Sequence, residues 1–175
     1  MDRSYLKSVI ARQPQTLNTL QPNEFRVVFS RIPHVVYFCQ RANLPGLSLN
    51  EWQQPTPFAT PVRRPAGQIL YDNFDMDFLV AEDMENWKQL HDWLTSIPPN
   101  VDFGNAKKDK ENYSDATLLI MNSVSKPFFA VHFRNCFPIS LSNIELLTTV
   151  NDIVPVACQA SFAYTGYYIE KLTNS

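Results

Sequence analysis

The clearest pattern near the start of the chain is an alternation of apolar and polar side chains over residues 24–32. Phe25, Val27 and Phe29 recur at every second position, which is typical of a strand with one buried face. A Pro-His step follows, and residues 35–41 are again rich in β-forming side chains. The pattern predicts an antiparallel hairpin made of these two strands.

A second alternation, over residues 74–80, predicts another half-buried strand. Its apolar side chains point inward, and Asp75 and Asp77 point outward, about 7 Å apart by the rise of a strand. With Asp72 they suggest a carboxylate cluster. No further ligand or acid accompanies them at a useful spacing, so we interpret this strand face as solvated.

The segment from residue 83 to 97 shows the spacing of an amphipathic helix. Asp83 can cap its first turn, and two consecutive prolines end it. The apolar stripe consists of Trp87, Leu90, Leu94 and Ile97, with Trp93 beside it. We expect this to be the single helix of the domain, covering one end of the strands.

Further β-rich stretches occupy residues 116–122, 128–134, 138–147 and 154–164. The chain is therefore predicted to be mainly β, with six to eight antiparallel strands and one helix in a β-sandwich or β-barrel. We divide it into an N-terminal arm, residues 1–22, and a single β-barrel domain, residues 23–175.

Segments outside these elements are candidates for contacts between subunits. In the N-terminal arm, Tyr5 and Val9 belong to a short apolar stripe that could dock on a neighbour. Residues 53–68 hold four prolines, which restrict them to an edge strand or an extended loop. Residues 100–113 are polar and are predicted to form a mobile surface loop.

Composition favours a protein that hides surface against other subunits. Aromatic residues make up 13% of the chain and charged residues 18%, which is below the ~25% of an average soluble domain. Interface cores are enriched in aromatic and depleted in charged side chains. A net charge of −2 disfavours a general polyanion binder.

The residues that could carry chemistry are scattered. The chain has no C-x-x-C pair, no histidine with a partner at metal-ligand spacing, no phosphate-binding glycine loop and no G-x-S-x-G motif. The cysteines and histidines are Cys39, Cys136, Cys158, His34, His91 and His132. We predict no catalytic residue, no cofactor and no metal site, and interpret the cysteines as free thiols.

No stretch approaches the ~20 apolar residues of a membrane helix, and the first residues lack the pattern of a signal peptide. We therefore expect no membrane insertion and assembly in the cytoplasm.

A set of short motifs, spread over residues 23–168, carries a family resemblance. They comprise two early strands, the second ending in a cysteine, polar residues and Leu-Pro, then a strand and a helix with an Asp-Trp pair, and closing strands. The motifs occupy residues 23–29, 36–45, 72–78, 92–93, 136–142 and 162–164. In order and spacing they resemble the tail tube proteins of T4-like contractile-tailed bacteriophages.

The resemblance implies a tube-like β-barrel subunit that forms a hexameric ring. Such rings stack into the inner tube of a contractile tail in the virion, and the genome DNA leaves through the lumen without specific binding. The implied partners are further copies of the chain, a sheath protein, a baseplate hub or tube initiator, and a tape measure protein. The main prediction is therefore the repeated subunit of the tail tube.

Ring formation also has a physical rationale, because edge-to-edge closure removes exposed strand edges. After Leu44-Pro45-Gly46, the resemblance implies an excursion over residues 47–64 with Trp52 and Phe58 as contacts between subunits. The alternative is a plain turn, which would require both rings to be buried within their own subunit. Asp75 and Asp77 are candidates for the lumen, since an acidic or neutral surface repels phosphate.

Alternatives remain open. The N-terminal arm and the loop at residues 100–113 are longer than expected of the core family, which would suit a baseplate tube initiator or a tube-terminating ring. A different class is a cytosolic OB-like or sandwich binding module. Such a module needs basic residues around its aromatic ones, and only Lys126 and Arg134 lie near residues 128–133.

Overall fold

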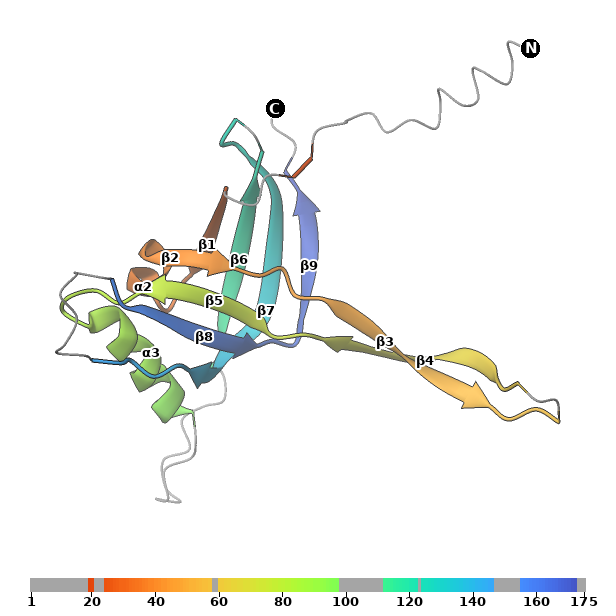
Figure 1. The fold of residues 1–175 in the computed structure, drawn as a ribbon. Coiled ribbons are helices and arrows are strands. Elements are labelled where there is room, and N and C mark those ends of the chain that lie inside the picture. Colours follow the sequence, from red (N-terminus) through yellow and green to blue (C-terminus); the bar gives the residue numbers. More distant parts are fainter. Residues whose placement is uncertain are drawn as a thin grey trace, which may run out of the picture.

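Two antiparallel layers of strands share one long strand in the computed structural model (Figure 1). The structure describes residues 19–20, 24–57, 60–97, 112–122, 124–146 and 155–172. Its strands are β1 (Phe25–Phe29), β2 (Cys39–Ala42), β3 (Leu47–Gln54), β4 (Val62–Tyr71), β5 (Phe74–Leu79), β6 (Ser114–Met121), β7 (Pro127–Leu141), β8 (Ala157–Ala163) and β9 (Gly166–Lys171). Its helices are α2 (Pro33–Tyr37) and α3 (Glu85–Ser96). The predicted mainly β, antiparallel fold is confirmed.

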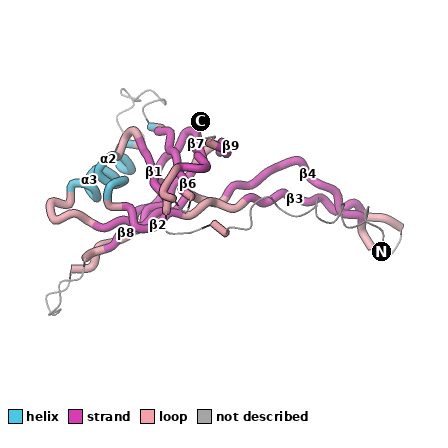
Figure 2. Tube along the Cα trace, turned by 90° about the horizontal axis from the view of Figure 1, so that it is seen from above, coloured by secondary structure: helices cyan, strands magenta, loops and turns pink. Residues whose placement is uncertain are grey.

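Strand β7 belongs to both layers. Its first half pairs with β6 and β9, and its second half pairs with β8. One layer is thus β1-β6-β7-β9, and the other is β7-β8-β5-β2. Strands β3 and β4 form a separate hairpin that projects from this body (Figures 1 and 2).

The change of partners along β7 occurs at Asn135. This residue has a φ of 54°, in the left-handed region that asparagine tolerates better than most side chains. Its backbone N–H donates to Asp115 Oδ1 at 3.1 Å, and its Nδ2 donates to Thr165 Oγ1 at 3.3 Å. Asn135 therefore bends β7 and ties the bend to both neighbouring strands.

Aromatic rings fill the space between the two layers. Phe74 of β5 lies 4.8 Å from the ring of Phe133 of β7 and 6.2 Å from that of Phe162 of β8. Phe29 of β1 closes the cluster, 5.0 Å from Phe162. All four side chains are buried, as the alternation along the strands predicted for Phe29 and Phe74.

Helix α3 covers one end of this core, as predicted, and buries Leu90. Of its aromatic residues it buries Trp93, which was predicted to lie beside the apolar stripe, and the other stripe residues Trp87, Leu94 and Ile97 are half-buried. Asp83 Oδ1 accepts from the Glu85 N–H at 3.1 Å, although the capping position itself is Met84. The buried Asn86 Nδ2 donates to Leu79 O at 2.7 Å. That bond holds the start of α3 against the end of β5.

The predicted hairpin of residues 24–41 is wrong. Strand β1 pairs with β6 and β2 pairs with β5, so the two lie in different layers. Between them residues 33–37 form α2, which begins with a proline and buries Val35, so the prediction of a single helix is also wrong. Proline suits the first helical turn, and burial of Val35 overrides the local β preference of its neighbours.

Two further differences concern the end of the chain. The strands predicted at 128–134 and 138–147 are one strand, β7, because Pro138 is tolerated in a stretch that pairs only with β8 among the described residues. Strand β9 was not predicted at all. The predicted loop at residues 100–113 lies almost entirely outside the described residues, as do residues 1–18 and 21–22 of the N-terminal arm.

The bend in β7 makes a prediction about stability. Asn135→Ala should unfold more easily than Asn135→Gly by about 1 kcal/mol, because alanine pays for the left-handed conformation and glycine does not. Both variants lose the hydrogen bond to Thr165, so their difference isolates the backbone. Urea unfolding measures it, and equal midpoints at equal slope would contradict the assignment.

Candidate assembly surfaces

The β3–β4 hairpin, residues 47–71, is named the arm from here on and is distinct from the N-terminal arm. Its two strands are the most exposed of the described strands. Every residue of β4 is exposed, and so are seven of the eight in β3. Figures 1 and 2 both show the arm leaving the body on the side away from α3. A two-stranded sheet on its own is marginally stable in water. Contact with another surface would therefore stabilise the arm.

One face at the base of the arm is apolar. Leu47 pairs with Tyr71 and Leu49 pairs with Ile69, and paired residues lie on the same side of a hairpin. Their exposed fractions are 56%, 39%, 55% and 52%, in that order. We name these four residues the apolar root face. Large exposed apolar patches of this kind mark interaction sites.

The outer part of the arm is more polar. Arg63 Nη1 lies 3.5 Å from Glu51 Oε2, an exposed ion pair that contributes little to stability. The register shifts between Leu49 and Glu51, opposite Gly67 with a φ of 77°. Trp52 pairs with Arg64 and is 54% exposed.

The predicted excursion after Gly46 is thus observed, and it is longer than expected, since the chain returns to the body only after Tyr71. A plain turn would have buried Trp52 within its own subunit, which the structure does not do. Phe58, Tyr5 and Val9 lie outside the described residues. Their contacts with other subunits, like those of Trp52, stay predictions.

Asp75 and Asp77 lie on the outer face of β5, as predicted, and both have local partners. Asp75 accepts from Ser161 Oγ on β8, and its N–H donates to Asn43 Oδ1 at 2.8 Å. Asp77 lies 3.4 Å from Arg41 Nη1 on β2. The two carboxylates therefore join three neighbouring strands, and no metal-binding group of histidine, cysteine or carboxylate residues occurs among the described residues.

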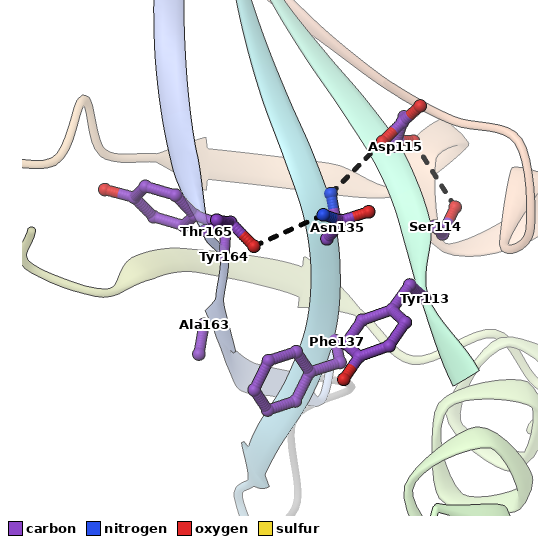
Figure 3. A pocket seen from close by; sticks show the side chains of 8 residues that line it. All are labelled: Tyr113, Ser114, Asp115, Asn135, Phe137, Ala163, Tyr164 and Thr165. Atoms are coloured by element: carbon purple, nitrogen blue, oxygen red, sulfur yellow. Dashed lines mark hydrogen bonds between the residues drawn. The ribbon is translucent and has the colours of Figure 1, made fainter. Parts of the chain in front are cut away.

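A pocket of about 680 Å³ opens beside the bend of β7 (Figure 3). Tyr113 and Phe137 line it edge to face, 5.7 Å apart, while Tyr164 points away from them (Figure 3). Two of its polar residues, Asn135 at the bend and Asp115 on β6, are joined by a hydrogen bond from the Asn135 N–H to Asp115 Oδ1. We therefore interpret the pocket as a result of the bend in β7.

Two of the three thiols, those of Cys39 and Cys136, are held in their protonated form. Burial raises the pKa of Cys39 to about 11 and that of Cys136 to about 12. A thiol acts as a nucleophile only as its thiolate.

No helix in the described part of the chain has the length and apolar character needed to cross a bilayer.

These pKa values predict the pH dependence of alkylation. Because both pKa values are raised, the thiolate fraction rises about tenfold per pH unit from pH 7 to 10, where an ordinary thiol of pKa ~8.5 levels off. Iodoacetamide labelling of the native protein, followed by mass spectrometry, measures this slope at each cysteine. A plateau near pH 8.5 at Cys39, with Cys39→Ser as the control for assignment, would contradict it.

Comparison with known proteins gives these surfaces a context. The model of a family described as phage tail tube protein matches residues 10–170. The tail tube terminator protein of Enterobacteria phage T4 is 25% identical over 135 residues, which cover 75% of this chain and 76% of that protein.

Solved structures of contractile injection systems share the fold. The tube-terminating cap of the anti-feeding prophage has a TM-score of 0.68 at 14% identity, covering 94% of this chain and 99% of that one. The sheath/tube terminator of an extracellular contractile injection system, PVC, has a TM-score of 0.65 at 17% identity, covering 89% and 99%. The PVC sheath–tube complex gives 0.64 at 18%, covering 94% and 97%.

The family match spans nearly the whole chain and agrees with the resemblance carried by its motifs. The chain therefore belongs to the phage tail tube protein family and is a structural protein of a phage tail.

Proposed function

We propose that this chain is a tube terminator, a ring that ends the tail tube of a contractile phage. The observation that carries the proposal is the match to the T4 tail tube terminator, which spans three quarters of both proteins. The sequence analysis put the repeated tube subunit first and the terminating ring among the alternatives. The T4 relative favours that alternative.

The arm supports assembly through contacts between copies. Its apolar root face would be an aggregation hazard if it stayed in water, and burying such side chains on a neighbour is favourable at about 25 cal/mol per Å². The arm and α3 lie at opposite ends of the subunit (Figure 1). A contact between the arm of one copy and a different surface of the next is head to tail, and such contacts form a ring when the rotation from copy to copy closes. We propose a hexamer, with Trp52 and the root face at the contact.

We further propose that the outer face of β5 and its neighbours borders the lumen. Asp75 accepts hydrogen bonds from Ser161 and Asn43, and Asp77 lies 3.4 Å from Arg41 Nη1, so the two carboxylates and the one guanidinium together carry a negative charge. Phosphate contacts dominate the affinity for DNA. Such a face lets DNA pass without being held.

The partners in this proposal are further copies of the chain, the last ring of the tube and the end of the sheath. A tape measure protein and DNA occupy the lumen during assembly and ejection, and the ring joins the virion in the host cytoplasm. Contact with a baseplate hub belongs to the alternative of a repeated subunit or an initiator.

Electron microscopy of negatively stained protein over a range of concentrations separates the alternatives. A terminator should give single rings or short stacks at every concentration, and it should stop the growth of tubes when added to polymerising tube protein. Long hollow rods made of this chain alone would show a repeated subunit. Monomers that neither form rings nor bind tube ends would count against the whole proposal.

Charge on the root face should abolish ring formation. Leu49→Asp places a carboxylate where the proposed contact excludes water, so the variant should remain a folded monomer. Leu70→Asp is the matched control, because Leu70 is also exposed and lies on the other face of the arm, opposite Ser48. Circular dichroism checks folding and light scattering the assembly state. Rings from Leu49→Asp, or equal loss in both variants, would refute the assignment of this face.

A further inference from the structure

Two tyrosine hydroxyls from the body bind the base of the arm. The arm is attached to the body by two short segments, residues 43–46 before β3 and residues 72–73 after β4, which we call its legs, and each leg accepts one of the two hydrogen bonds. Tyr167 OH donates to Pro45 O at 3.1 Å, just before β3 begins. Tyr164 OH donates to Asp72 O at 2.8 Å, just after β4 ends. Both tyrosines come from the β8–β9 corner, which is far from the arm in sequence. The two carbonyls they bond mark the points where the chain leaves and re-enters the body.

A third tyrosine, Tyr71 from the arm itself, packs against both rings, which lie 6.0 Å from each other. The ring of Tyr71 lies 5.8 Å from that of Tyr164 and 5.7 Å from that of Tyr167, edge-on to both. Phe133 packs beneath, 5.0 Å from Tyr164 and 5.6 Å from Tyr167. Aromatic pairs of this geometry stabilise beyond their buried area. Through Phe133 the base of the arm is connected to the buried core.

The backbone closes tightly at the same place. The Asp72 N–H donates to Gly46 O at 3.2 Å and the Asn43 N–H donates to Asp75 O at 3.1 Å. A Cβ on Gly46 would lie 2.6 Å from Asp72 Oδ2. The absence of a side chain at Gly46 therefore leaves room for the Asp72 carboxylate between the two legs.

We propose that Tyr164 and Tyr167 form a clamp, a pair of positioning residues that fixes the direction in which the arm leaves the body. Without the clamp, the arm would be attached only through two short legs and their few backbone hydrogen bonds. The two hydroxyls hold both legs from one side, so the arm cannot swing about either. The consequence for assembly rests on the proposed function; the clamp itself does not.

Hydrogen bonds connect the clamp to β7, the strand that both layers share. Thr165, which lies between the two clamp positions, donates its N–H to Arg134 O of β7 at 3.0 Å, and its hydroxyl accepts from Asn135 Nδ2. The angle of the arm is thus set against the bend of β7. A closed ring needs the same angle in every copy, because a small error per subunit accumulates around the ring.

The hydroxyl of Tyr164 is suited to this donor role over a wide pH range. Burial raises its pKa well above the usual value near 10, and nearby Tyr167 and Asp72 raise it further. The group therefore stays protonated and keeps its hydrogen bond throughout the physiological range.

Spin labels test the clamp directly. One label at Gln53→Cys on the arm and one at Lys88→Cys on α3, in a Cys39→Ser background, report the arm-to-body distance by pulsed electron resonance. Labelled protein is diluted with unlabelled protein, so that only distances within one subunit are measured. The double variant Tyr164→Phe/Tyr167→Phe keeps both rings and removes both hydroxyls. Tyr168→Phe is the matched control, because Tyr168 is also on β9 but stacks on His132 of β7, away from the legs of the arm.

We expect the double variant to broaden the distance distribution about twofold and the control to leave it unchanged. In hydrogen exchange, the Asp72 amide should exchange roughly two- to tenfold faster, as expected for the loss of one neutral hydrogen bond. A distribution as narrow as that of the wild type, with unchanged exchange at Asp72, overturns the clamp. A broadened distribution with normal rings supports the clamp and counts instead against the arm as the docking element of the proposed function.

Discussion

The bend of β7 at Asn135 sets how the two layers of strands lie against each other. One strand of fifteen residues serves two layers, and it can do so only because it changes direction at Asn135. The bend places β8 and β9 on successive stretches of the same strand. It thereby brings the faces of the two layers together, so that Phe29, Phe74, Phe133 and Phe162 meet in one aromatic core.

The same bend determines how the arm is presented. The β8–β9 corner lies beside Asn135, and from this corner Tyr164 and Tyr167 reach the legs of the arm. Core, corner and arm are therefore one connected set of ring contacts and hydrogen bonds. For a protein that assembles, rigidity of this kind lowers the cost of docking, because less freedom is lost when the contact forms.

Most groups in the described residues that could carry chemistry are already engaged or buried. The carboxylates of β5 are engaged by Ser161, Asn43 and Arg41, and burial keeps the thiols of Cys39 and Cys136 protonated. Several large apolar side chains are exposed together on the arm, among them Leu47, Leu49 and Ile69. An exposed apolar surface of this kind is suited to contact with another protein, which agrees with membership of a family of structural tail proteins.

Periodicity along the chain was enough to predict the buried faces of β1 and β5 and the place of α3, because it shows which face of an element is apolar, and Phe74 and Leu90 follow it. The excursion after Leu44-Pro45-Gly46 was predicted from the family resemblance. Which strands are neighbours follows from the tertiary fold alone, because an alternation with a period of two is the same whatever strand lies beside it. Phe25 pairs with Ile120 of β6 and not with the next strand along the chain. Residues 33–37 form a helix in which Val35 is buried. Pro138 lies within β7, where only β8 pairs with it among the described residues. The tyrosine clamp depends in the same way on contacts between residues more than ninety positions apart, which no local pattern encodes.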